Sequence, residues 1–166
     1  LEGRKFWILG LSPVSRDQLL LGKFAFAATG SFLIAESLIL TSDLLLGLPW
    51  EGLLLHAVVV AVLALGLSAL NVGLGAYLPT FRETDPSKIV VGFGGTVNMV
   101  AGLGFLIVVI GLMAVPFHAA QLANRATSVP VSPWVFAGVP VAFAIGVAVI
   151  ILPLRSGARA LRGMEF

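Results

Sequence analysis

Four long apolar runs constrain the fold of this chain more than any other feature of its sequence. They cover about residues 24–42, 53–78, 89–115 and 134–154. Each run has roughly the 20 residues that a helix needs to cross a bilayer core of about 30 Å. Charged residues make up 11% of the 166 residues, whereas soluble domains contain about 25%. We therefore predict an all-α polytopic membrane protein with four transmembrane helices.

The second and third runs are longer than a simple span. At ~1.5 Å per residue each would extend about 40 Å, which exceeds the hydrocarbon core. Such helices must tilt, protrude or break. Because glycine loosens a helix, residues 71–75 and 92–95 are the expected weak points.

Lys and Arg residues predict the orientation of the spans. Nine of the ten lie before the first run, between the second and third, or after the fourth, and only Arg125 lies on the other side. The positive-inside rule then places segment 1–23, the loop 79–87 and the tail 155–166 in the cytoplasm. We expect a multi-pass protein of the cell membrane with both ends of this chain cytoplasmic. The nine residues are Arg4, Lys5, Arg16, Lys23, Arg82, Lys88, Arg155, Arg159 and Arg162.

Segment 1–23 has the charges that the rest of the chain lacks. An apolar block that contains Trp7 follows charged residues, a composition that suits a short helix lying along a membrane surface. Pro13 should end that helix, because proline lacks an N–H and disfavours helix in the preceding residue. The segment could press on a soluble partner, or it could be only a solvated flank before the first span.

A second helix should begin directly after this break and run into the membrane. Ser15 can cap it, and Gln18 stands three residues later, which is the spacing of a capping box. The competing assignment takes Ser12 as the cap and places Pro13 in the first turn.

The order of residue types in segment 1–23 is an acid, a base, an apolar block, Ser-Pro-hydrophobic-Ser and then Gly-Lys. The residues concerned are Glu2-Gly3-Arg4, Phe6-Trp7-Ile8-Leu9, Ser12-Pro13-Val14-Ser15-Arg16 and Gly22-Lys23. This pattern resembles a recurring segment of ABC exporter permeases, in the branch whose membrane subunits have six-helix units. In that family the segment is the first cytoplasmic coupling element, which docks on the ATP-binding subunit.

The resemblance extends over nearly the whole chain. It implies a second cytoplasmic loop between the two middle spans and a structured outer segment, residues 116–133, before the last span. Residues 119–125 within that segment favour a short helix. The family's first two spans have no counterpart here, so we interpret the chain as a C-terminal portion. Residues 162–166 look like a natural terminus.

The resemblance implies the permease part of an ABC exporter, which works with a separate ATP-binding subunit. ATP and magnesium would belong to that partner. The 166 residues contain no Gly-x4-Gly-Lys-Ser/Thr motif and no hydrolase or metalloprotease motif, so we expect no catalytic residue, metal or cofactor in this chain. The expected contacts to the ATP-binding subunit are Glu2, Arg4, Phe6, Trp7, Arg16, Asp17, Phe81, Arg82, Glu83 and Asp85.

The composition and the span count also bear on the other partners. Lys, Arg, Asp and Glu are too few for a nucleic-acid surface, so membrane lipid is the other expected contact. Four spans make a poor translocation route, which implies a dimer or a longer permease chain.

Glu36 is the one acid deep inside a span. A carboxyl at membrane depth is costly and is therefore a functional candidate. The alternative is a helix-packing hydrogen bond to Asn71, Asn98 or Ser68. Glu36 also supports a rival function, a proton- or ion-coupled carrier, and a membrane scaffold without transport is the third reading.

The remaining polar and small residues favour packing roles. His56 and His118 belong to no metal motif. Both lie near the outer ends of spans, where a shared metal or haem site is conceivable, but we interpret them as interfacial histidines because metal sites usually need three or four ligands. Small residues recur every four positions in two runs, which lets helices approach closely in lipid. The runs are Ala27, Ser31, Ala35 and Gly138, Ala142, Gly146.

Overall fold

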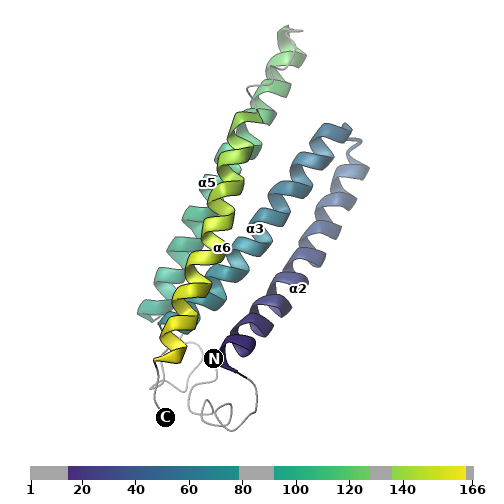
Figure 1. Ribbon diagram of the computed structural model, residues 1–166. Helices are drawn as coiled ribbons and strands as arrows, with labels where there is room; N and C mark the ends of the chain where they lie inside the picture. The colour runs from purple at the N-terminus through teal and green to yellow at the C-terminus, as the bar shows by residue number, and fades with distance from the viewer. Residues whose placement is uncertain (1–14, 79–91, 128–135, 164–166) are drawn as a thin grey trace.

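The computed structural model describes residues 15–78, 92–127 and 136–163, and within them the chain forms an antiparallel bundle of long helices (Figure 1). All four helices are long and apolar enough to cross a membrane, which confirms the prediction at the level of length and composition. The helices are α2 (Arg16–Leu45), α3 (Trp50–Tyr77), α5 (Phe93–Thr127) and α6 (Gly138–Arg162).

The bundle has two ends, which we call the basal end and the distal end. At the basal end α2 begins and α6 ends, and at the distal end α2 ends and α3 begins. The helix α5 has 35 residues, roughly 50 Å at 1.5 Å per residue. It extends past the α2–α3 hairpin at the distal end (Figure 1). A helix of that length must tilt or protrude from a ~30 Å core.

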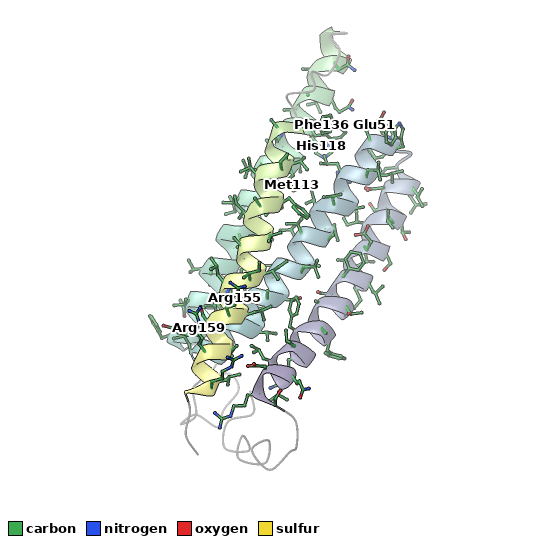
Figure 2. The ribbon with its side chains drawn as sticks, viewed as in Figure 1. Glu51, Met113, His118, Phe136, Arg155 and Arg159 are labelled. Atoms are coloured by element: carbon green, nitrogen blue, oxygen red, sulfur yellow. The ribbon has the colours of Figure 1, made fainter. Side chains whose placement is uncertain are left out.

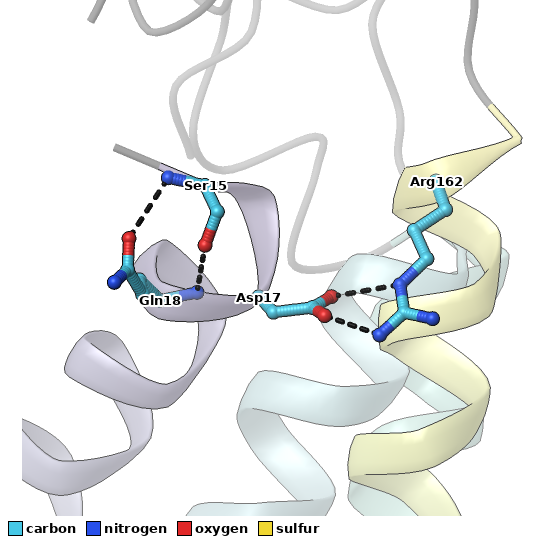
Figure 3. A network of polar contacts seen from close by, with 4 residues as sticks. All are labelled: Ser15, Asp17, Gln18 and Arg162. Carbon is cyan, nitrogen blue, oxygen red and sulfur yellow. Dashed lines mark hydrogen bonds and ion pairs between the residues drawn. The ribbon is translucent and has the colours of Figure 1, made fainter. Parts of the chain in front are cut away.

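The start of α2 follows from local sequence. The Ser15 hydroxyl accepts the backbone N–H of Gln18 at 3.3 Å, and the Gln18 side chain accepts the N–H of Ser15 at 3.0 Å (Figure 3). This reciprocal pair satisfies two backbone donors that the first turn would otherwise leave open. The predicted capping box is confirmed.

The turn between α2 and α3 is a Schellman motif. Gly47 has φ +63°, where glycine avoids the clash of a Cβ atom. Its N–H donates to the Leu44 carbonyl, and the Leu48 N–H donates to the Asp43 carbonyl. The first apolar run ended at residue 42, which left Asp43 outside the predicted span. This residue lies instead in the last turn of α2 and is 4% exposed, because the helix ends only where Gly47 reverses the chain.

The central helix of the bundle is α3, which packs against α2, α5 and α6. Buried residues recur along it, and α5 presents a matching stripe at every fourth position. Met113 and Val109 of that stripe are fully buried. The buried core consists of Leu55, Val59, Val62, Leu70, Phe105, Val109, Met113, Phe117 and Ala142.

The seam between α3 and α6 depends on small residues. A Cβ atom at Gly73 would collide with the backbone of Pro153, and one at Gly157 would lie 2.7 Å from the Gly73 carbonyl oxygen. A Cβ atom at Gly146 would lie 2.8 Å from Val62. The second small-residue run thus does pack closely, as predicted. The expected weak point at residues 71–75 is wrong, because α3 continues through it and Gly73 serves the close approach to α6.

The first small-residue run lies nearer the surface of the bundle. Ala28, rather than Ala27, is the buried residue of α2 in this region. The glycine-rich residues 92–95 coincide with the start of α5 rather than with a break inside it.

Pro116 does not end α5. The sequence had separated an outer segment, residues 116–133, from the third span at this proline, but α5 runs through it to Thr127. A proline inside a helix removes one backbone hydrogen bond, here the one to the Leu112 carbonyl. The backbone of Gly138 packs directly on that carbonyl, and a Cβ atom there would collide with it. Neighbouring helices allow such prolines in membrane spans, and residues 128–133 lie outside the described residues.

The helix α6 is also longer at its basal end than the apolar run that predicted it. It passes through Pro153 and ends at Arg162, whereas the sequence placed residues 155–166 in a tail. Residues 155–161 are rich in Arg, Ala and Leu, which favour helix. As a result Arg155 and Arg159 lie on α6 near the basal end (Figure 2).

Candidate functional site

A basal clamp joins the first turn of α2 to the last turn of α6. We define it as Arg16, Asp17, Arg162 and the Leu161 carbonyl. The Arg16 guanidinium donates to the Leu161 oxygen at 2.6 Å. The Arg162 Nε donates to one oxygen of Asp17 at 3.1 Å, and its terminal nitrogen donates to the other (Figure 3). This bidentate geometry is the strongest form of an Arg–carboxylate pair.

The clamp also suits the dipoles of its two helices. Asp17 stands at the positive N-terminus of α2, and Arg162 stands at the negative C-terminus of α6. Each side chain therefore stabilises its own helix end as well as the contact. The Asp17–Arg162 pair is exposed to solvent, where screening weakens such contacts.

The clamp changes how the predicted docking residues are understood. Arg16 and Asp17 were assigned to a contact with the ATP-binding subunit, and the structure joins both to α6. Arg162, which was not assigned, completes the pair. The other docking residues lie outside the described residues, so their role stays a prediction: Glu2, Arg4, Phe6, Trp7, Phe81, Arg82, Glu83 and Asp85.

Glu36 lies in the distal half of α2 without the hydrogen bonds that the packing alternative predicted. Its Oε2 atom is buried, and no partner for it is found among the described residues. Ser68, one proposed partner, pairs instead with Ser31 across α2 and α3 at 3.1 Å. The other two bind each other, since the Asn98 amide donates to the Asn71 oxygen. None of the three hydrogen bonds of the packing alternative is therefore seen for Glu36.

At the distal end, a chain of polar contacts links three helices. The Asp43 carboxylate of α2 contacts Nδ1 of His56 on α3 at 2.8 Å. The Nε2 atom of His56 then meets Nε2 of His118 on α5 at 3.0 Å. We call Asp43, His56 and His118 the distal triad. The structure thus brings together the two histidines that the sequence analysis interpreted as interfacial residues near span ends.

The sequence contains a signal for two of these pairs that the prediction did not use. Asp43 and His56 stand at equal sequence distances on either side of the Pro49–Trp50 bond, and so do Ser31 and Ser68. In an antiparallel helical hairpin, residues equidistant from the turn lie at the same level. His118 comes from a separate helix, and no local rule predicts its place.

Taken together, the described residues form four helices that fit a multi-pass membrane protein, with polar contacts at both ends of the bundle. Between these ends lies Glu36, for whose buried oxygen no partner is found among the described residues. In the described part of the chain, no group of three or more His, Cys, Asp or Glu side chains is arranged to hold a metal ion.

The whole chain, residues 1–166, matches the sequence model of a family described as a putative ATP-binding cassette. The chain therefore belongs to this family, which links it to the ABC transporters. No curated protein and no solved structure matches it.

Proposed function

We propose that this chain is part of the membrane-spanning permease of an ABC exporter, and that a separate subunit binds and hydrolyses ATP. The observation that carries the proposal is a contrast within one chain. The chain matches an ATP-binding-cassette family along its whole length, yet its described residues form four apolar helices. The 166 residues also contain no Gly-x4-Gly-Lys-Ser/Thr motif that could cradle ATP phosphates.

The basal clamp gives this proposal a mechanical element. Segment 1–23 is the predicted coupling element, and its last residues are already the first turns of α2. Because Arg16 and Asp17 hold α6, a push on the segment would reach two helices at once. We infer that ATP binding closes the partner subunits, moves this segment, and shifts the basal end of α2, which pulls on the last turn of α6 through the clamp. The basal end would then face the cytoplasm, and a second copy or a longer chain would complete the translocation route.

The test is co-purification of the chain with its ATP-binding subunit, together with the rate of ATP hydrolysis. The variant Arg4→Glu with Arg82→Glu reverses two charges in the predicted docking segments and leaves the clamp intact. Like charges facing each other at an interface are strongly unfavourable, so the variant should insert normally but lose both binding and stimulation. The matched control is Arg159→Glu, an exposed residue of α6 near the same end (Figure 2). Parent-like binding and stimulation by the docking variant would contradict the proposal.

A second candidate function is a proton-coupled carrier, and Glu36 is the observation that favours it. Its buried oxygen without a partner marks a costly group that a packing role does not explain. The variant Glu36→Gln keeps the shape and removes the titratable proton. If a proton gradient drives flux in the absence of ATP, and Glu36→Gln abolishes that flux in a folded protein, the carrier function replaces the exporter. Unchanged flux in the Glu36→Gln variant would rule out the proton-coupled carrier function.

A further inference from the structure

The distal triad brings together all the imidazoles of the sequence. The 166 residues contain two histidines, which are 62 positions apart and belong to different helices. Their Nε2 atoms lie 3.0 Å apart. The packing of apolar helices does not require this contact between two imidazole rings, because an aliphatic residue could fill either position.

The Asp43 carboxylate orients the His56 ring and favours one of its tautomers. An ionised carboxylate only accepts hydrogen bonds, so the contact with Asp43 favours the His56 tautomer in which Nδ1–H donates the hydrogen bond. In that tautomer the Nε2 atom presents its lone pair toward His118. Histidines that bind metal ions are usually held in this way, with the second ring nitrogen donating to a carboxylate. Asp43 is 4% exposed, so water competes little for this bond.

The position of His118 is supported from the other side. The adjacent Phe117 is buried, and its ring meets the His118 ring edge to face with centroids 5.4 Å apart. Phe117 also packs against α3, since a Cβ atom at Gly52 would lie 3.7 Å from its ring. These contacts hold α5 against α3 next to the two imidazoles. His118 itself is exposed, which leaves a route for an ion and its water ligands.

We propose that His56 and His118 form a binding site for a divalent transition-metal ion of the zinc and copper class, with Asp43 as the positioning residue. Two imidazole ligands of a tetrahedral ion with bonds of about 2.0–2.1 Å have nitrogen atoms roughly 3.3 Å apart. The observed 3.0 Å needs only a small separation of the rings. Imidazole nitrogen suits zinc, copper and nickel, whereas magnesium and calcium prefer oxygen.

The site differs from a structural zinc site in its number of protein ligands. Two come from the chain and water supplies the others, consistent with the lack of larger ligand groups among the described residues. The ion would be exchangeable and would fasten α3 to α5 at the distal end. Through Asp43 it would also fix the end of α2. This inference does not depend on the proposed exporter function.

The experiment uses the full chain in detergent, purified through a tag that contains no histidine, with Cu²⁺ as the probe. Pulsed electron paramagnetic resonance counts the imidazoles bound to copper. We expect two imidazoles in the parent and one in His118→Gln, an exposed position where the substitution should not disturb folding. One imidazole or none in the parent would overturn the proposal, and so would equal copper binding by a variant that lacks both histidines.

Two further variants separate a metal site from adventitious copper. Asp43→Asn keeps both imidazoles but weakens their support, so copper should bind roughly 10–100-fold more weakly with two imidazoles still counted. Gln121→Ala changes a polar residue one turn further along α5 and should bind copper like the parent. Unchanged affinity in Asp43→Asn, or a loss in Gln121→Ala as large as in His118→Gln, would contradict the assignment. Circular dichroism and the elution profile establish that each variant is folded.

Discussion

The helices α2 and α3 form one hairpin, yet they are held in the bundle in different ways. In the apolar 18-residue stretch of α3 that could span a membrane, half of the residues are buried, whereas 6% are buried in the corresponding stretch of α2. The helix α3 meets α6 through close glycine contacts such as that of Gly73 with Pro153. The helix α2 is attached by polar pairs at three levels, Asp17–Arg162, Ser31–Ser68 and Asp43–His56.

This difference teaches which part of the bundle can move. In lipid, both close packing and interhelical hydrogen bonds hold helices together, and the hydrogen bonds are individually weak. A hydrogen bond can be exchanged for another partner, whereas a closely packed glycine seam has no second arrangement of equal quality. We therefore expect the contact between α2 and α3 to rearrange more easily than the glycine seam between α3 and α6. The helix α2 is also the one that continues from the predicted coupling segment.

The largest expected effect separates Gly73 from Gly30. Leucine at Gly73 would force the α3 backbone away from Pro153, whereas at Gly30 nothing lies within 4 Å of a new Cβ atom. We expect Gly73→Leu to lower the free energy of unfolding by about 3 kcal/mol or more and Gly30→Leu to leave it nearly unchanged. Unfolding in mixed micelles, followed by circular dichroism, measures both. Equal losses in the two variants would mean that the close approach of Gly73 to Pro153 does not stabilise the bundle.

A smaller effect tests the polar attachment of α2. Ser68→Ala removes the bond between Ser31 and Ser68, and interhelical hydrogen bonds in membranes contribute about 0.6 kcal/mol on average. The control is Ser37→Ala, because the Ser37 hydroxyl donates only within its own helix, to the Ile34 carbonyl at 3.0 Å. The same unfolding assay applies. If Ser68→Ala costs more than about 2 kcal/mol, α2 is as firmly fixed as α3.

The smallest effect on stability is expected at the basal clamp. Asp17→Asn removes an exposed charge, so unfolding should be almost unchanged. The distance distribution between spin labels at the basal ends of α2 and α6 should nevertheless broaden, and high salt should broaden it in the parent. Exchanging the charges, with Asp17→Arg and Arg162→Asp together, should narrow the distribution again only in part, because each charge then opposes the dipole of its helix. A distribution that neither Asp17→Asn nor salt alters would mean that the clamp does not hold α2.

Local sequence was sufficient for some of these features. The apolar runs predicted the four helices, and the Ser15–Gln18 capping box predicted where α2 begins, because both depend on neighbouring residues alone. Pro116 misled the prediction because neighbouring helices can accommodate a proline inside a membrane span, and contacts such as that of Gly138 with the Leu112 carbonyl are not visible in local sequence.

The sites were harder to predict for the same reason. The partner of Asp17 is 145 positions away and that of His56 is 62 positions away in α5. The partners of Ser31 and Asp43, by contrast, could have been found from their equal distances to the hairpin turn. Glu36 was recognised as unusual, but whether Ser68, Asn71 or Asn98 would satisfy it required the packed structure.

The most direct test of the whole account is the membrane position of the two ends of the bundle. The sequence contains no cysteine, so single cysteines can be introduced at Leu46, exposed in the distal turn, and at Gly163, at the basal end of α6. A membrane-impermeant maleimide is then applied to intact cells and to lysed cells. The account predicts labelling of Leu46→Cys in intact cells and of Gly163→Cys only after lysis. Labelling of Gly163→Cys in intact cells, with Leu46→Cys protected until lysis, would place the basal end outside and contradict a permease driven from the cytoplasm.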